Sequence, residues 1–184
     1  MKTVCILDYG IGNLKSLNNA FIKLDTNVIL SSEYKDILKS DYLILPGVGA
    51  FANAMEKLKL LNLDDIILEF ISYGKPFIGI CLGMQMLFDK SEEFGITKGI
   101  GLIEGNVVKI PIEKKHLRLP NIGWNNLVPS RYNKWKNSIL NDLSRDDRVY
   151  FIHSFCCMPK SEENILAKTF YRDIEFCASV QKEN

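Results

Sequence analysis

The first hundred residues alternate between short, mainly apolar runs and segments whose apolar residues recur every three or four positions. The runs predict buried strands, and the three-to-four spacing predicts amphipathic helices. The predicted strands cover residues 4–7, 27–30, 42–45 and 76–80, and the predicted helices cover 64–73, 82–88 and a segment with Asn13 as N-cap and an apolar face of Leu14, Leu17, Phe21 and Leu24. Because strands that alternate with helices form parallel sheets, the sequence predicts an open, mostly parallel α/β sheet with helices on both faces.

The second half of the chain has more strand-like segments and fewer helices between them. Its predicted strands cover residues 107–110, 124–128, 149–154, 165–170 and 175–180, with one short helix at 137–143. This pattern favours an antiparallel C-terminal extension of the same sheet. Since no Ser/Gly-rich linker or change of composition interrupts the chain, we expect a single domain over residues 1–184.

Composition excludes several classes of protein. The net charge is +1, from 23 basic and 22 acidic residues, so neither nucleic acid nor an anionic membrane is expected as a partner. No apolar run approaches the roughly 20 residues that span a bilayer, and the N-terminus does not resemble a signal peptide. The 5 cysteines are odd in number and show no CxxC spacing, which predicts no disulfide scaffold, no metal and a cytoplasmic location.

The segment Gly79-Ile80-Cys81-Leu82-Gly83 lies between a predicted strand and a predicted helix. A nucleophile with glycines two residues to either side is typical of a nucleophile elbow, where larger side chains would clash. The turn would expose Cys81 at the carboxyl edge of the sheet, and the following helix would favour its thiolate. The backbone N–H of Leu82 would lie near an oxyanion. The competing interpretation is a small buried core cysteine.

A second loop, Pro46-Gly47-Val48-Gly49, also follows a predicted strand. Its glycines allow backbone amides to approach a ligand closely, so the loop could supply a second oxyanion donor. An ordinary strand-to-helix turn has the same composition.

A cysteine nucleophile needs a base, usually a histidine, and this chain contains 2. His116 lies in a basic stretch that reads as a solvated loop, and His153 ends a predicted strand. His153 either reaches the site or is a hydrogen-bonded core residue, and the sequence leaves both open.

Five motifs occur in order along the whole chain: DYGIGNL from Asp8, PGVG from Pro46, GICLGMQ from Gly79, PNIGWN from Pro120 and YFIHS from Tyr150. Together they resemble the glutaminase subunits of imidazole glycerol phosphate synthase, which are class I, triad-type glutamine amidotransferases. The resemblance implies hydrolysis of glutamine to glutamate and ammonia, without a cofactor, in histidine biosynthesis. It also implies a heterodimer in which a synthase (cyclase) subunit receives the ammonia.

Site roles follow from this resemblance residue by residue. Cys81 would form a γ-glutamyl thioester, and backbone groups of Val48, Gly49 and Leu82 would form the oxyanion hole, which in the family is completed when the partner responds. The substrate would contact Gly47, Gln85, His153 and Ser154, and the partner and ammonia exit would lie at Asn13, Pro120 and Trp124.

The sequence departs from the family in two places. The family's catalytic histidine and glutamate follow soon after the position of Val180, whereas this sequence stops at Asn184 without them. We therefore expect a chain that lacks its last elements through truncation, which the strand-like end favours, or else a natural variant that binds without hydrolysing. Asn121 also stands where the family usually has histidine.

Three alternatives remain at this stage. One is a paralogue that supplies ammonia to a different synthase, for example one that amidates a surface sugar. Another is a catalytically inactive partner-binding protein, which the missing triad residues favour. The third is a redox-active cysteine protein, against which the motifs around Asp8 and Trp124 argue.

Overall fold

The computed structural model describes residues 2–112, 117–131, 134–144 and 146–182. They divide into two compact units, described separately below. The N-terminal unit contains the chain up to Leu87 together with Thr97–Ile100, and the C-terminal unit contains Phe88–Ile96 and the residues from Gly101 onward. The single-domain organisation stays a prediction. None of the helices in the described part of the chain is long and apolar enough to cross a membrane.

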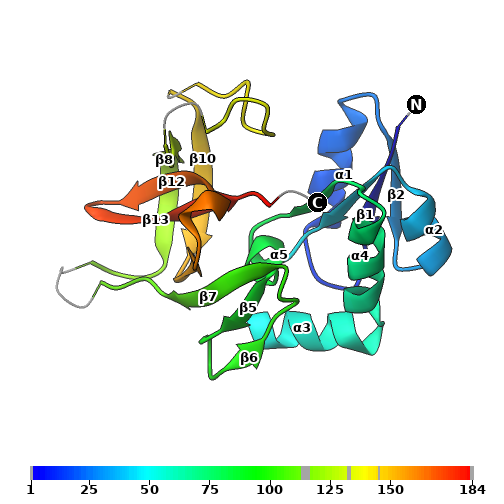
Figure 1. Ribbon diagram of the computed structural model, residues 1–184, viewed down its shortest axis with the longest axis horizontal. Coiled ribbons are helices and arrows are strands. Elements are labelled where there is room, and N and C mark those ends of the chain that lie inside the picture. The colour runs from blue at the N-terminus through cyan, green and yellow to red at the C-terminus, as the bar shows by residue number, and fades with distance from the viewer. Residues whose placement is uncertain (1, 113–116, 132–133, 145, 183–184) are drawn as a thin grey trace. The chain divides into compact units, whose positions relative to one another are not determined.

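The N-terminal unit is built on four parallel strands in the order β2-β1-β3-β4, of which β1 and β2 are labelled in Figure 1. Their bounds are β1 Thr3–Leu7, β2 Asn27–Ser31, β3 Tyr42–Leu45 and β4 Phe77–Gly79. All four were predicted to within about one residue at each end, because each is a short apolar run that ends at a polar, proline or glycine residue. Parallel strands place their carboxyl ends at one edge, so the loops that follow β1, β3 and β4 are neighbours.

Helix α1, Leu14–Ile22, covers one face of this sheet. Asn13 caps it as predicted, its side chain accepting a hydrogen bond from the Ser16 amide at 3.2 Å. The packed side chains are Val4, Ile6 and Ile44 from the sheet and Leu14, Leu17 and Phe21 from the helix. The placement of Leu24 on this apolar face was wrong, because the helix ends at Ile22 and the chain turns through Asp25, at a φ of 53°, leaving Leu24 exposed.

Among the described residues, four further helices belong to this unit: α2 Tyr34–Lys39, α3 Phe51–Leu60, α4 Leu63–Ser72 and α5 Leu82–Gln85. Of these, α4 and α5 were predicted. Helix α2 packs against β1, β2 and α4, and α3 packs against α4. The buried residues of α3 recur at helical spacing: Phe51, Ala54, Met55 and Leu58. Successive residues of β1 point to alternate faces of the sheet. Val4 and Ile6 therefore point to one face, and Cys5 points to the other, near Asp36 of α2.

The C-terminal unit is dominated by antiparallel pairing. Strands β5-β7-β11-β13-β12-β9 lie in this order in one sheet, where only β5 and β7 run parallel. A separate two-stranded ribbon joins β8 and β10 (Figure 1). The bounds are β5 Phe88–Ser91, β7 Ile103–Lys109, β8 Asn121–Asn126, β9 Val128–Pro129, β10 Arg148–His153, β11 Phe155–Pro159, β12 Ile165–Tyr171 and β13 Ile174–Val180, with a 3-10 turn at Glu162–Asn164.

The antiparallel character of the second half was predicted correctly, but two details were wrong. Among the described residues, none of these strands pairs with the four-stranded parallel sheet, so they do not extend it. The helix at 137–143 is instead a series of turns, with Asn137 at a φ of 61°. Just before these turns, the indole N–H of Trp135 donates to the Leu166 carbonyl at 3.0 Å, and its ring packs in the cluster around Leu127 and Leu166.

Candidate active site

Cys81 lies on the turn between β4 and α5, which spans Leu82–Gln85. Its φ of 57° and ψ of −114° are strained for any residue other than glycine. Such strain on an exposed strand-to-helix turn is the backbone geometry of an elbow, so the predicted geometry is confirmed, while the role of Cys81 as nucleophile stays a prediction. The helix is shorter than predicted, because Met86 already ends it and β5 begins at Phe88.

The two flanking glycines are required by close backbone contacts. A Cβ atom added at Gly79 would lie 2.6 Å from the carbonyl oxygen of Gly83. A Cβ atom added at Gly83 would lie only 1.9 Å from the carbonyl oxygen of Leu45, on the neighbouring strand β3. The elbow is therefore held both by its own turn and by the strand beside it.

The loop of residues 46–49, called loop 46–49 below, packs directly against this elbow. A Cβ atom at Gly47 would lie 2.8 Å from the Gly83 nitrogen and 2.9 Å from the Leu82 Cβ. The far end of the loop is open: Val48 is exposed, and Gly49, at a φ of 89°, has nothing within 4 Å of a built Cβ. The structure thus brings together two motifs that lie more than thirty residues apart in the sequence.

The Sγ atom of Cys81 experiences two opposing influences. Desolvation by the surrounding atoms raises the pKa of the thiol, while the Leu82 N–H, which donates to the sulfur, lowers it by a smaller amount. The net direction is upward, so the resting group is a protonated thiol near neutral pH. The predicted preference for thiolate was wrong for this state, because desolvation outweighs the hydrogen bond from the Leu82 N–H.

His153 is hydrogen-bonded at both ring nitrogens within the C-terminal unit. Its Nδ1 lies 2.9 Å from the Phe155 carbonyl oxygen, which accepts only, so Nδ1 carries the proton. Its Nε2 lies 3.0 Å from the amide nitrogen of Asn121 and accepts from it. Desolvation lowers the pKa of His153, which keeps the ring neutral. Of the two interpretations of His153, the hydrogen-bonded core residue is the one that these contacts favour; His116 lies outside the described residues.

The other predicted site residues divide between the two units. Gln85 ends α5 and is half-buried, and Asn13 is exposed at the start of α1, so both belong to the N-terminal unit with Cys81. Ser154, half-buried, and Pro120, exposed, belong to the C-terminal unit.

One face of the β8–β10 ribbon is apolar and exposed. Trp124 pairs in register with Tyr150, and Ile122 with Ile152. The exposed fractions are 56% for Ile122, 64% for Trp124, 49% for Tyr150 and 57% for Ile152. The two aromatic rings lie 5.4 Å apart between centroids. We call these four residues the ribbon patch; contiguous apolar surface of this kind is typical of a protein interface.

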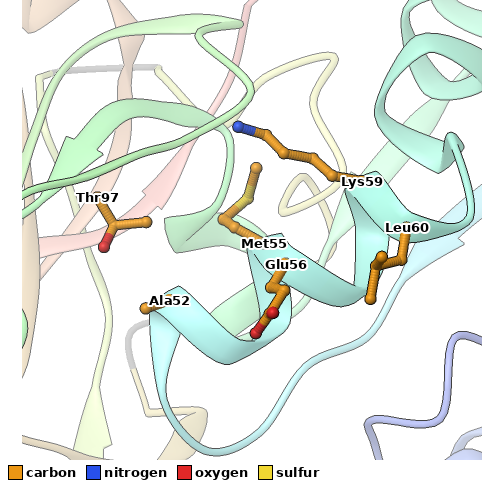
Figure 2. A pocket seen from close by; sticks show the side chains of 6 residues that line it. All are labelled: Ala52, Met55, Glu56, Lys59, Leu60 and Thr97. Atoms are coloured by element: carbon orange, nitrogen blue, oxygen red, sulfur yellow. The ribbon is translucent and has the colours of Figure 1, made fainter.

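The sequence reasoning overlooked two polar contacts. Tyr9 donates a buried hydrogen bond to the Pro46 carbonyl, and Asn121 donates to His153. The position of Tyr9 just after β1, next to the strand that carries loop 46–49, was a usable signal. A cavity of about 410 Å³ beside α3 is lined by none of the predicted site residues (Figure 2). Its lining is Ala52, Met55, Glu56, Lys59, Leu60 and Thr97.

Comparisons with known proteins agree with this geometry. Residues 5–184 match the family model "Glutamine amidotransferase class-I". Imidazole glycerol phosphate synthase subunit HisH 1 of Legionella pneumophila (strain Lens) is 45% identical over 100% of this chain and 88% of its own length. The HisH subunit of Aquifex aeolicus is 42% identical over 100% of this chain and 85% of its own length.

Solved structures extend the likeness to the fold. A glutamine amidotransferase crystal structure aligns with a TM-score of 0.68 at 16% identity, covering 90% of this chain and 79% of the other. PurLQS from Thermotoga maritima aligns with a TM-score of 0.62 at 15% identity, covering 94% and 76%. At such identities the likeness concerns the α/β architecture alone.

Proposed function

This chain belongs to the class I glutamine amidotransferase family, and we propose that Cys81 is the nucleophile with which it releases ammonia from glutamine. Its function is that of the glutaminase subunit of imidazole glycerol phosphate synthase, in histidine biosynthesis, as in relatives 42 to 45% identical over the whole chain. The observation that carries the assignment of Cys81 is its strained φ of 57° on an exposed turn whose two glycines admit no side chain.

The chemistry assigned to Cys81 is acyl transfer. Its Sγ attacks the carboxamide carbon of glutamine, the carbon–nitrogen bond breaks, and ammonia leaves with the proton that the thiol gave up. Water then hydrolyses the thioester to glutamate. Proton transfer from Sγ requires a base, and His153 does not supply it, because both of its ring nitrogens are hydrogen-bonded.

The oxyanion formed during attack needs backbone donors, and two groups beside Cys81 suit this role. The Leu82 N–H donates to the Cys81 sulfur, so it lies on the side of the turn where an oxyanion would form beside that sulfur. Loop 46–49 packs on the elbow at Gly47, while Val48 and Gly49 remain exposed. We assign the second donor to an amide of Val48 or Gly49, and a glutamine contact in the same unit to Gln85.

We assign the ribbon patch to the synthase subunit that receives the ammonia. Four exposed apolar side chains on one ribbon face form a surface that a partner would bury. Trp124 is the largest of them, and buried aromatic residues contribute strongly at the centre of interfaces. The names of the relatives support this choice of occupant, because they describe subunits of a synthase. A cytoplasmic location is part of this proposal, since all five cysteines are free.

The test is to replace Cys81 by serine and to measure both reactions of the complex with the synthase subunit. We expect Cys81→Ser to lower glutamine-dependent synthesis at least about a thousandfold. Synthesis from added ammonium salt should be unchanged, because only the ammonia supply is lost. Surviving glutamine turnover in the variant would refute the assignment of the nucleophile. A wild-type complex that forms but never turns over glutamine would indicate an inactive partner-binding protein instead.

A further inference from the structure

Tyr9, in the segment between β1 and α1, makes a contact that the proposed mechanism does not yet use. Its side chain is only 3% exposed, and its hydroxyl donates to the Pro46 carbonyl oxygen at 2.6 Å. Burial raises the pKa of the Tyr9 hydroxyl, so it remains a protonated donor throughout the physiological range. Pro46 is the first residue of loop 46–49, so this hydrogen bond joins the end of β1 to the beginning of that loop.

The accepted carbonyl is the first one beyond the hydrogen-bond ladder of the sheet. The last carbonyl of β3, that of Leu45, accepts from the Ile80 amide at 2.9 Å. Pro46 has no N–H, so its carbonyl is the only backbone group through which hydrogen bonding can orient this residue. Because a trans peptide is planar, with C=O and N–H pointing in opposite directions, fixing the Pro46 oxygen also fixes the direction of the Gly47 N–H.

Steric contacts restrict the same peptide from two other sides. A Cβ atom at Gly12 would lie 3.2 Å from the Pro46 Cβ, so the segment before α1 lies close against the proline ring. On the far side, Gly47 lies against Leu82 and Gly83 of the elbow. Loop 46–49 therefore has a fixed beginning, Pro46–Gly47, and an open end, Val48–Gly49.

We propose that Tyr9 is a positioning residue for the oxyanion hole, its hydroxyl orienting the Pro46–Gly47 peptide so that the amides that follow face the carbonyl attacked by Cys81. This inference rests on the proposed function. Without the hydroxyl, the Pro46 carbonyl would be left unsatisfied, and the peptide would rotate to find another donor. The amides of Val48 and Gly49 would then spend less time in the orientation that stabilises the transition state.

The experiment compares Tyr9→Phe with Tyr42→Phe in the complex with the synthase subunit. Both changes remove one hydroxyl, and Tyr42 is a half-buried residue of β3 in the same sheet. For each variant we would measure kcat and KM for glutamine, ammonia-dependent synthesis, and thermal unfolding. We expect Tyr9→Phe to lower kcat roughly tenfold with KM changed less than about twofold, as the loss of one preorganising hydrogen bond implies. Tyr42→Phe should retain wild-type kcat.

Each other outcome overturns a specific statement. A wild-type kcat in Tyr9→Phe would exclude a positioning role for the hydroxyl. An equal loss of kcat in both variants, or a Tyr9→Phe protein that does not fold, would make the hydroxyl a stability element only. If the wild-type complex itself released no ammonia from glutamine, the proposed function would fail, and the role of Tyr9 would fail with it.

Discussion

The elbow of the N-terminal unit and the ribbon of the C-terminal unit differ in how closely other atoms of the chain pack against them. The backbone beneath Cys81 is tightly packed: a Cβ atom added at Gly47, Gly79 or Gly83 would lie less than 3 Å from backbone atoms. On the β8–β10 ribbon, four apolar side chains face solvent with nothing of comparable closeness over them. The first region is specified by contacts within the chain, whereas the second is the surface that we propose contacts another chain. Changes in the elbow should therefore act on folding, and changes in the ribbon patch should act on association.

The strongest way to break the elbow is Gly83→Ala. The new methyl group would lie 1.9 Å from the Leu45 carbonyl oxygen, so β3 and the elbow must separate. We expect a loss of about 3 kcal/mol or more in the free energy of unfolding, measured by urea denaturation. Gly74→Ala is the matched control: it has open space around a φ of 69°, and should cost only about 1 kcal/mol. Equal stabilities of the two variants would contradict the close packing described here.

The ribbon patch should respond in the opposite way. Trp124→Ala should weaken the complex with the synthase subunit by about 2 kcal/mol, roughly thirtyfold in the dissociation constant. The unfolding of the isolated subunit should change little, because Trp124 is 64% exposed. Ile139→Ala removes another exposed apolar side chain of the same unit, outside the patch, and should leave the affinity unchanged. Titration calorimetry would measure both; equal affinities of the two variants would argue against this interface.

A smaller effect should distinguish the buried side of the ribbon from its exposed face. Asn121→Ala removes the donor to the Nε2 atom of His153, and should lower the free energy of unfolding by about 1 kcal/mol. Asn125→Ala, on the same strand, should stay within about 0.5 kcal/mol of wild type. A larger loss in the free energy of unfolding for Asn125→Ala than for Asn121→Ala would show that the hydrogen bond between Asn121 and His153 does not stabilise the ribbon.

The smallest expected effect concerns the resting thiol. Because desolvation raises the pKa of Cys81, less of it is thiolate at pH 7 than in an unfolded peptide. Its alkylation by iodoacetamide should therefore be slower than that of a peptide cysteine at pH 7, and should rise with pH through a midpoint above the ordinary value. Mass spectrometry would follow the modification, and a midpoint below the ordinary value would show that the Leu82 amide outweighs desolvation.

The sequence predicted best those features that depend on contacts between residues close together in the chain. The four parallel strands and the elbow depend on local patterns, such as the apolar run before Gly79 and the glycines around Cys81, and these were readable. Helix α3 was also present as the spacing of Phe51, Ala54, Met55 and Leu58, but no helix was predicted there. Helix α2 buries only Ile37, so its pattern was too weak to detect.

Long-range contacts were not readable in this way. The clash that makes Gly83 necessary involves a carbonyl on another strand, at Leu45. The hydrogen bond between Asn121 and His153 exists because the register of β8 and β10 places these residues opposite each other. Beside the turns at 137–143, Trp135 donates to the carbonyl of Leu166, thirty-one residues further along the chain. Predicting any of these contacts requires knowing which distant segments of the chain lie side by side. The local spacing of apolar residues does not contain that information.

The distribution of the cysteines has a practical consequence for counting active molecules. Cys5, Cys156, Cys157 and Cys177 are buried, and Cys81 alone is exposed. A sample of native subunit should thus contain one accessible thiol per chain, which reacts before the four buried ones, and that thiol is the proposed nucleophile. The number of accessible sulfhydryls, divided by the number of chains, would give the fraction of the preparation that is still competent. Oxidative ageing of a stock should reduce this ratio and the ammonia yield together, well before the fold is lost.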